Sequence, residues 1–282
     1  MDAILLCMKK RGIRFFSKLR FQNSEVVKFY ERKSFLKALC SRYRKFDNVL
    51  LIAHGSDSAI LTTTNDLNKP YTVYITSNEA HAFKNDFVFA VSCLTANEFG
   101  KCCVERGAIA YLGYQAEIGC LFYSYSVENK NFPKRITYYV DIMIKRIFVE
   151  ELSRVYEEFL TSPISVRVLK ERFSYQLEHR IAQLTDIPTT QLNTKYGIKL
   201  TERDSQKYVV EVILRMLSYL NDILPKLVCI GDENYISASY LTYRRRDGFD
   251  SKQLSEELEA NHAFQSIIHD NYKQHLRELA SK

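Results

Sequence analysis

Residues 46–57, Phe-Asp-Asn-Val-Leu-Leu-Ile-Ala-His-Gly-Ser-Asp, contain an unbroken apolar run that ends on a histidine and a glycine. Such a run is typical of a strand in a parallel sheet that is covered on both faces. Residues 84–93, Lys-Asn-Asp-Phe-Val-Phe-Ala-Val-Ser-Cys, follow the same pattern and end on Cys93. Both segments therefore predict buried parallel strands, each with a chemically reactive side chain at its carboxyl end, where ligands and catalytic groups gather in open sheets.

The segments around these runs alternate between strand-like and helix-like patterns. Ser24 precedes apolar residues at helical spacing, so we expect a helix with its N-cap at Ser24. Within residues 58–76, two β-prone runs flank a turn-rich stretch at 65–70 and predict a hairpin or an edge excursion. The expected elements are strands at 3–8, 48–55, 84–93 and 108–115, and helices at 24–46, 77–83 and 95–106, the last closed by Gly107 at its C′ position. This alternation predicts an α/β fold of three layers with a mostly parallel sheet.

The pattern changes after Phe132-Pro133, where strand-like runs disappear. Apolar residues then recur at helical spacing through 136–160, 165–184, 203–224 and 252–279, with one interruption at 185–199. The sequence therefore predicts an α/β core over residues 1–130, followed by a mostly helical region over 131–282. We expect the helical region to regulate the core or to bind a partner.

Composition narrows the class of protein. The chain has seven cysteines, and this odd number does not favour a framework of paired disulfides. The N-terminal apolar stretch precedes its charges, which is the wrong order for a secretory signal. No apolar run reaches the roughly 20 residues of a membrane-spanning helix, so we expect a cytoplasmic protein with no membrane partner. The net charge of +7 includes local basic clusters only at Lys9-Lys10-Arg11 and Arg244-Arg245-Arg246. A nucleic-acid surface is therefore an alternative that the charge distribution does not favour.

The two predicted strand ends would bring His54 and Cys93 to one edge of the sheet. Cys93 follows His54 by 39 residues, which is enough for an excursion and a crossover helix. An imidazole can take the proton of a neighbouring thiol and later return it to a leaving amine. Gly55 lets the backbone approach a substrate, and its N–H can face the oxygen of a tetrahedral intermediate. A helix beginning near Thr95 would also point its positive end toward Cys93.

These residues resemble the caspase-like clan of cysteine peptidases, and most closely its bacterial branch that includes CHAT domains. The resemblance covers about residues 49 to 115: a strand ending in His-Gly, a later strand ending in Cys93 and then a Gly107-Ala108 segment. It implies His54 as general acid and base, Cys93 as nucleophile and Gly55 as oxyanion donor, with no cofactor or metal. Cys93 stands in Val-Ser-Cys-Leu-Thr instead of the Gln-Ala-Cys-x-Gly of caspases, so aspartate specificity is not implied.

The resemblance further implies an endopeptidase that cleaves a partner protein after a signal, in a prokaryotic stress or antiviral defence pathway. The alternative is a catalytically inactive caspase-like scaffold or sensor that binds a partner through its helical half. A zinc site built from His54, Cys93 and one of Cys102-Cys103 matches no standard zinc framework, and the doublet is expected to pack in two directions.

Other polar residues near the predicted edge remain secondary candidates. His81 is a reserve base, and Asp57, Asp66 and Glu117 could receive a basic substrate side chain. Motifs of serine hydrolases, P-loop proteins, dinucleotide-binding proteins and HExxH metalloproteases are absent from the sequence. The pairing of His54 with Cys93 is therefore the only catalytic hypothesis that the sequence favours.

Overall fold

The computed structural model describes residues 3–8, 15–16, 19, 21, 24–29, 32–39, 47–62, 72–119, 134–201, 206–237 and 240. A six-stranded sheet has the order β2-β1-β3-β7-β8-β9. Five of its strands are parallel to one another: β1 (Ala3–Met8), β2 (Ser24–Phe29), β3 (Asn48–Ile52), β7 (Phe87–Val91) and β8 (Ala110–Tyr114). The sixth, β9 (Leu227–Gly231), is antiparallel to β8. The predicted α/β class with a mostly parallel sheet is therefore confirmed.

A second, smaller sheet lies between β3 and β7 in the chain. Its strands β4 (His54–Ser56), β5 (Ala59–Thr62) and β6 (Thr72–Thr76) are antiparallel and occur in that order. The hairpin expected over residues 59–76 is confirmed as β5 and β6, although its turn lies outside the described residues. This excursion begins directly after β3, so His54 stands where the chain leaves the large sheet.

Helices cover both faces of the large sheet. On one face Phe89 of β7 packs against Tyr156 of α3 (Lys134–Thr161) and Phe173 of α4 (Val166–Ala182). On the other face Tyr111 of β8 packs against Phe99 of α2 (Phe99–Glu105), which also contacts the 3-10 helix η2 (Ser77–Phe83). Another helix, α1 (Arg32–Leu39), contacts β2 and β6. The side chains of β3, β7 and β8 are consequently buried throughout.

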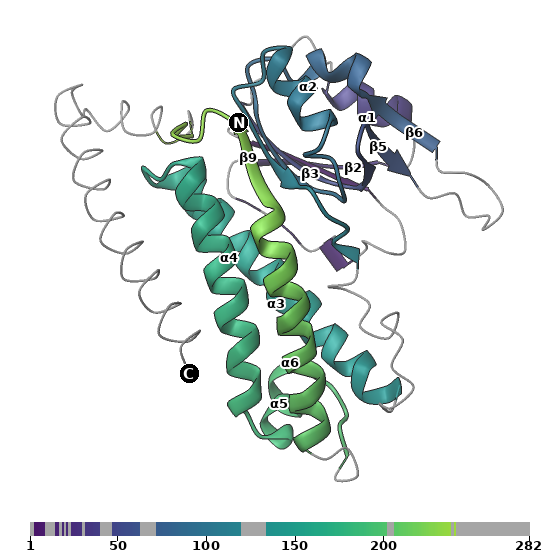
Figure 1. Cartoon of the computed structure of the whole chain (residues 1–282), viewed down its shortest axis with the longest axis vertical. Coiled ribbons are helices and arrows are strands. Elements are labelled where there is room, and N and C mark those ends of the chain that lie inside the picture. Colours follow the sequence, from purple (N-terminus) through teal and green to yellow (C-terminus); the bar gives the residue numbers. More distant parts are fainter. Residues whose placement is uncertain are drawn as a thin grey trace.

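The second half of the chain is largely helical, as predicted. The helices α3, α4 and α6 (Gln206–Ile223) pack side by side and extend away from the sheet, with the short α5 (Thr189–Tyr196) near their far end (Figure 1). The last predicted helix, at 252–279, lies outside the described residues. Among the helices of the described residues, none has the length and apolarity needed to cross a bilayer.

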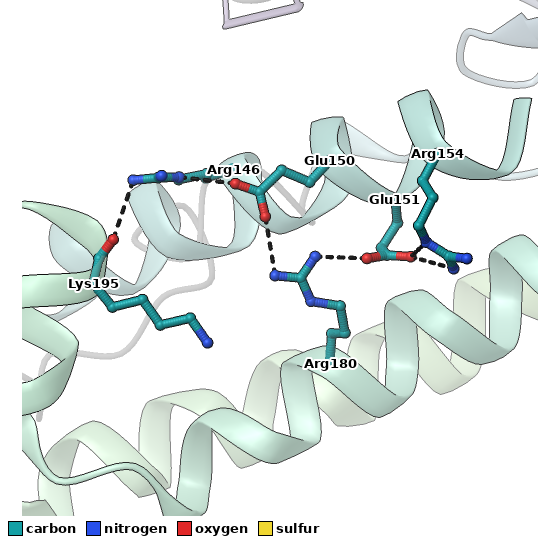
Figure 2. Close-up of polar contacts among 6 residues, drawn as sticks. All are labelled: Arg146, Glu150, Glu151, Arg154, Arg180 and Lys195. Carbon is teal, nitrogen blue, oxygen red and sulfur yellow. Dashed lines mark hydrogen bonds and ion pairs between the residues drawn. The ribbon is translucent and has the colours of Figure 1, made fainter. Parts of the chain in front are cut away.

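An ion-pair network joins α3 to α4 and α5 (Figure 2). The carboxylate of Glu151 is 2% exposed and accepts hydrogen bonds from Arg154 and, at 2.6 Å, from Arg180. Arg180 also binds Glu150, which in turn binds Arg146. Burial alone lowers the pKa of Arg180, but its hydrogen bonds to Glu151 and Glu150 outweigh this and raise it. The network therefore holds a buried carboxylate between two cations and fixes the spacing of these helices.

Three local expectations are wrong. Residues 24–29 form β2 instead of the start of a helix, so Ser24 is no N-cap. The helix expected from about Thr95 begins at Phe99. Strands do not disappear after residue 133, because β9 follows α6 and pairs with β8 at the sheet edge. The helical segment 134–223 is therefore inserted between two strands of one sheet, and its end is anchored in the core; the boundary at 130/131 stays a prediction.

Candidate active site

His54 and Cys93 lie just beyond the last paired residues of two adjacent strands. In the β3–β7 ladder Ile52 pairs with Val91, and every pair in it joins residues that are 39 positions apart. The same interval separates His54 from Cys93. The Ala53 N–H donates to the Val91 carbonyl at 3.4 Å, which extends the contact by one residue beyond the ladder. Side chains alternate along a strand, so an extension of this register by two residues would place both on the side of the sheet that faces α3 and α4.

Gly55 brings the turn after β3 directly against the turn after β7. A Cβ atom at Gly55 would stand 2.6 Å from the carbonyl oxygen of Cys93, and nearer still to Ser92 Oγ and Thr95 Cγ2. Real Cβ atoms essentially never approach other atoms below 3.0 Å, so this position requires glycine. The backbones of the two predicted catalytic segments are therefore in contact.

The Gly55 N–H lies outside the β4–β5 hydrogen-bond ladder. Ser56 pairs with Ala59 across the two-residue turn at Asp57-Ser58, and a pair next to such a short turn exchanges both of its hydrogen bonds. Pairs alternate in an antiparallel ladder, so Gly55 and Ile60 form a pair that exchanges none. The Gly55 N–H consequently points away from β5, which is compatible with a role as an oxyanion donor.

The turn that carries Cys93 has an uncommon backbone conformation. Leu94 has φ +61°, in the left-handed region that branched and bulky residues seldom adopt. Two hydrogen bonds hold this turn against the end of β8 and the segment that follows it: Ala96 N–H to the Tyr114 carbonyl and Leu94 N–H to the Ala116 carbonyl, each 3.1 Å. Strained residues of this kind persist where the surroundings over-determine them, and they are frequent at active sites.

Burial raises the pKa of the Cys93 thiol above its ordinary value. Backbone N–H groups of Ile118 and Gly119 hydrogen-bond to the sulfur and act in the opposite direction, whereas the negative charge of Glu117 raises the pKa further. On balance the thiol is protonated at neutral pH. Cys93 therefore needs a neighbouring base in order to act as a nucleophile, and the histidine at the adjacent strand end is the candidate for that role.

The N-terminus of α2 does not support the sulfur as expected. The backbone N–H groups of Glu98 and Phe99 donate to the Asp57 carbonyl, at 3.2 and 2.7 Å, so the start of this seven-residue helix is tied to the β4–β5 turn. The donors near Cys93 come instead from Ile118 and Gly119, which sequence analysis missed. These donors could have been suspected from their position in the sequence. Residues 115–119 directly follow β8, and β8 is the neighbour of β7, the strand that leads to Cys93.

Of the secondary candidates, the structure brings two toward the site and removes one. Glu117 acts on Cys93 by its charge, and Asp57 accepts a hydrogen bond from Asn97 at 2.6 Å near the start of α2. His81 is exposed on η2, and its carbonyl binds the Lys84 N–H in the turn that leads into the amino end of β7, opposite to the end near Cys93. Asp66 lies outside the described residues.

The Cys102-Cys103 doublet lies toward the opposite edge, where the Cys103 carbonyl accepts a hydrogen bond from the Ala108 N–H just before β8. Cys103 is fully buried while Cys102 is half-buried, so the doublet faces two ways as predicted. Within the part of the chain that the structure describes, no three His, Cys, Asp or Glu side chains are grouped as metal ligands. The zinc alternative therefore gains no support from the described residues.

Comparison with known proteins adds no assignment for this site. The sequence matches no described protein family, and no curated protein is significantly similar to it. The functional argument therefore depends on the geometry itself: a histidine, a close-packed glycine and a cysteine, gathered where two adjacent parallel strands end.

Proposed function

We propose that the chain is a cysteine endopeptidase of the caspase-like type, with Cys93 as nucleophile and His54 as general acid and base. One observation carries the proposal: the β3–β7 register has the interval that separates His54 from Cys93, and Gly55 lies against the Cys93 carbonyl. Adjacent strand ends on the same side of a sheet are where a catalytic pair of this kind is needed. The mostly parallel sheet with helices on both faces also supports the resemblance found in the sequence.

The reaction that follows is an acyl transfer through sulfur. His54 accepts the thiol proton as the Cys93 sulfur attacks the peptide carbonyl carbon, and the carbonyl π electrons move to its oxygen. The Gly55 N–H donates to that oxyanion, a contact worth roughly 3–4 kcal/mol in the transition state. His54 then gives the proton to the leaving amine as the C–N bond breaks, and water hydrolyses the thioester. Because His54 serves in both steps, its loss should be about as harmful as the loss of Cys93.

The helical half is proposed to control this site. The Gln115 N–H donates to the Lys226 carbonyl at 2.8 Å, so the end of α6 and η6 (Leu224–Lys226) is joined to the segment that also holds Ile118 and Gly119. A partner that displaces α6 would therefore move donors at the Cys93 sulfur. The raised pKa of Cys93 suits a resting enzyme that a signal activates. The proposed setting is a prokaryotic cytoplasm, in a stress or antiviral defence pathway, with a partner protein as substrate.

A peptide library tests the proposed activity without knowledge of the natural substrate. Full-length protein is incubated with a proteome-derived peptide library, and new N-termini are identified by mass spectrometry. We expect wild-type protein to generate cleavage products that the variants Cys93→Ala and His54→Ala both fail to generate. Identical products from wild type and Cys93→Ala would contradict the proposal, as would the absence of any cleavage by wild-type protein in the presence of its activating partner.

A non-catalytic scaffold is the second candidate, and one feature favours it. Three large apolar side chains, Tyr138 on α3 and Tyr208 and Leu214 on α6, are between 42% and 57% exposed, which suits contact with a partner. A scaffold would bind its partner equally well as wild type and as Cys93→Ala, without change to the partner's covalent structure. Intact-mass measurement of the partner after binding separates the two functions.

A further inference from the structure

The charges of α3 are divided along its length. Residues 134–146 contain four cations and one acid, Asp141, which is only 2% exposed, whereas residues 150–158 contain four acids and one cation. Three of these four acids pair with Arg172 or Arg180 of α4. Packing against α4 therefore accounts for the acids, but the excess of cations at the beginning of the helix needs a separate explanation.

Helix stability does not supply that explanation. The first turn of α3 contains Lys134 and Arg135 and no acid. The helix dipole favours acids in the first turn and disfavours cations there. The two cations therefore oppose the helix that carries them.

A second segment adds cations at the same place. The Arg135 guanidinium donates to the Lys199 carbonyl, and Arg146 Nη1 donates to the Lys195 carbonyl at 3.3 Å (Figure 2). The end of α5 and the chain that follows it are thus held along α3, and both lysine side chains are exposed. Lys134, Lys195 and Lys199 form no ion pair with a carboxylate of the described residues. Their charges are therefore not neutralised within this part of the chain.

An exposed aromatic ring lies beside these cations. Tyr138 is 57% exposed and stands one turn after Lys134 on α3. Its ring centroid is 5.5 Å from that of Tyr139, and the Arg135 guanidinium lies over the Tyr139 ring at 5.7 Å. The ring of Tyr138 is consequently available at the surface, directly next to a cation that stacks on its neighbour.

The surface along α5 is also hollowed. An open hollow of about 510 Å³ is lined by Ile187, Thr190, Gln191, Thr194 and Lys195. Apart from Ile187 this lining is polar, and it contains no acid. Lys195 therefore provides the charge of the hollow and also belongs to the segment held along α3.

We propose that this end of the helical half binds single-stranded nucleic acid. The distal basic surface consists of five exposed residues: Lys134, Arg135, Tyr138, Lys195 and Lys199. Its cations neutralise phosphates, which gives affinity without reading the sequence, and its tyrosine ring stacks on a base. An acidic protein segment would use the cations but has no need of the exposed ring, so the surface favours a nucleic acid.

This surface could not be recognised as a local cluster in the sequence, because Arg135 and Lys199 are 64 residues apart. The inference does not depend on the proposed peptidase activity. Its ligand binds far from the strand ends that carry His54 and Cys93, since α5 lies at the end of the helices away from the sheet (Figure 1).

The test measures binding of full-length protein to a fluorescent oligodeoxythymidine of about 20 nucleotides by fluorescence anisotropy. The site variant is Lys195→Glu with Lys199→Glu. The control variant is Lys37→Glu with Lys101→Glu, which changes two exposed lysines of α1 and α2 and alters the net charge equally. Thermal unfolding shows whether each variant is folded.

With four cations engaged, the logarithm of the wild-type affinity should fall against that of the salt concentration with a slope of about −3, or about 50-fold between 50 and 200 mM NaCl. The site variant should bind at least about tenfold more weakly at 50 mM NaCl and reduce the slope by about half. The control variant should stay within about threefold of wild type. Tyr138→Ala should weaken binding at least about fivefold with an unchanged slope.

Equal losses in the site and control variants would overturn the inference, since they would show attraction to the net charge alone. Unaltered binding by Tyr138→Ala would overturn the assignment to a single strand. Displacement of the oligonucleotide by polyglutamate at an equal concentration of charges would identify an acidic protein segment as the ligand instead. Peptidase activity enters none of these measurements, so the proposed function and this inference can fail separately.

Discussion

Replacing Gly55 with alanine tests whether the His-Gly turn lies directly against the turn that carries Cys93. The added methyl carbon would stand 2.6 Å from the Cys93 carbonyl oxygen, where ordinary contact begins at 3.4 Å, and closer still to Ser92 Oγ and Thr95 Cγ2. The carbonyl belongs to the backbone and cannot rotate away as a side chain could. The two turns must therefore separate by about 1 Å, on the scale of overpacking that a close-packed protein interior resists.

The consequences of this displacement can be estimated separately for stability and for chemistry. Inserting a methyl group into a well-packed site costs about 1–3 kcal/mol of folding free energy. A misplacement of about 1 Å between reacting groups costs about 100-fold in rate. Gly55→Ala should consequently remain folded but lose most of its Cys93-dependent peptidase activity.

Urea unfolding followed by far-UV circular dichroism measures the first effect, since the chain has no tryptophan to report on the core. Cleavage of a peptide identified from the library measures the second. The matched stability control is Gly119→Ala, which adds the same methyl group to the neighbouring turn. Apart from its chain neighbours, no atom of the described residues lies within 4 Å of that position, so this variant should lose no stability. If Gly55→Ala is as stable and as active as wild type, the two turns are not in contact and the proposed geometry is wrong.

Three further predictions follow from the electrostatics. Arg180→Ala should lower the free energy of unfolding by about 2–4 kcal/mol, because it removes one of two cations from the buried Glu151 carboxylate. The control Arg146→Ala breaks an exposed ion pair and should lower the free energy of unfolding by less than about 1 kcal/mol. Urea unfolding measures both losses, and equal losses would contradict the buried network. Because burial raises the pKa of Cys93, its alkylation rate in the resting protein should still be rising with pH at pH 9.0, and a plateau below pH 8 would refute this. Glu117→Gln should lower that pKa and speed alkylation of Cys93 about twofold at low salt, with the gain reduced in 1 M NaCl; no change at either salt would exclude the charge effect.

The central strands could be predicted from sequence because a strand that is buried on both faces has apolar residues at successive positions. Residues 49–53 and 87–91 are continuous apolar runs, and no other element accommodates them as well. The same reasoning failed at 24–29, where Val26, Val27 and Phe29 satisfy both a helical and a strand pattern. Pairing with β1 decides the outcome there, and a local pattern contains no information on that pairing.

Non-local contacts also account for the other differences. The five residues of β9 follow a long helix, and their partner β8 lies more than a hundred residues earlier in the chain. The late start of α2 reflects the turn around Leu94, which is held by residues 114–116. Within the site, the strand-end positions of His54 and Cys93 were predictable from their apolar runs. The backbone donors of Ile118 and Gly119 were not, because any residue type supplies an N–H.

Labelling with a peptide probe tests the central claim most directly. A short peptide that carries a thiol-reactive carbonyl group is incubated with full-length protein and its activating partner, and the labelled cysteine is identified by mass spectrometry. The proposed function predicts labelling confined to Cys93 and lost in His54→Ala. Comparable labelling of several cysteines, or labelling of Cys93 that is unchanged in His54→Ala, would contradict it.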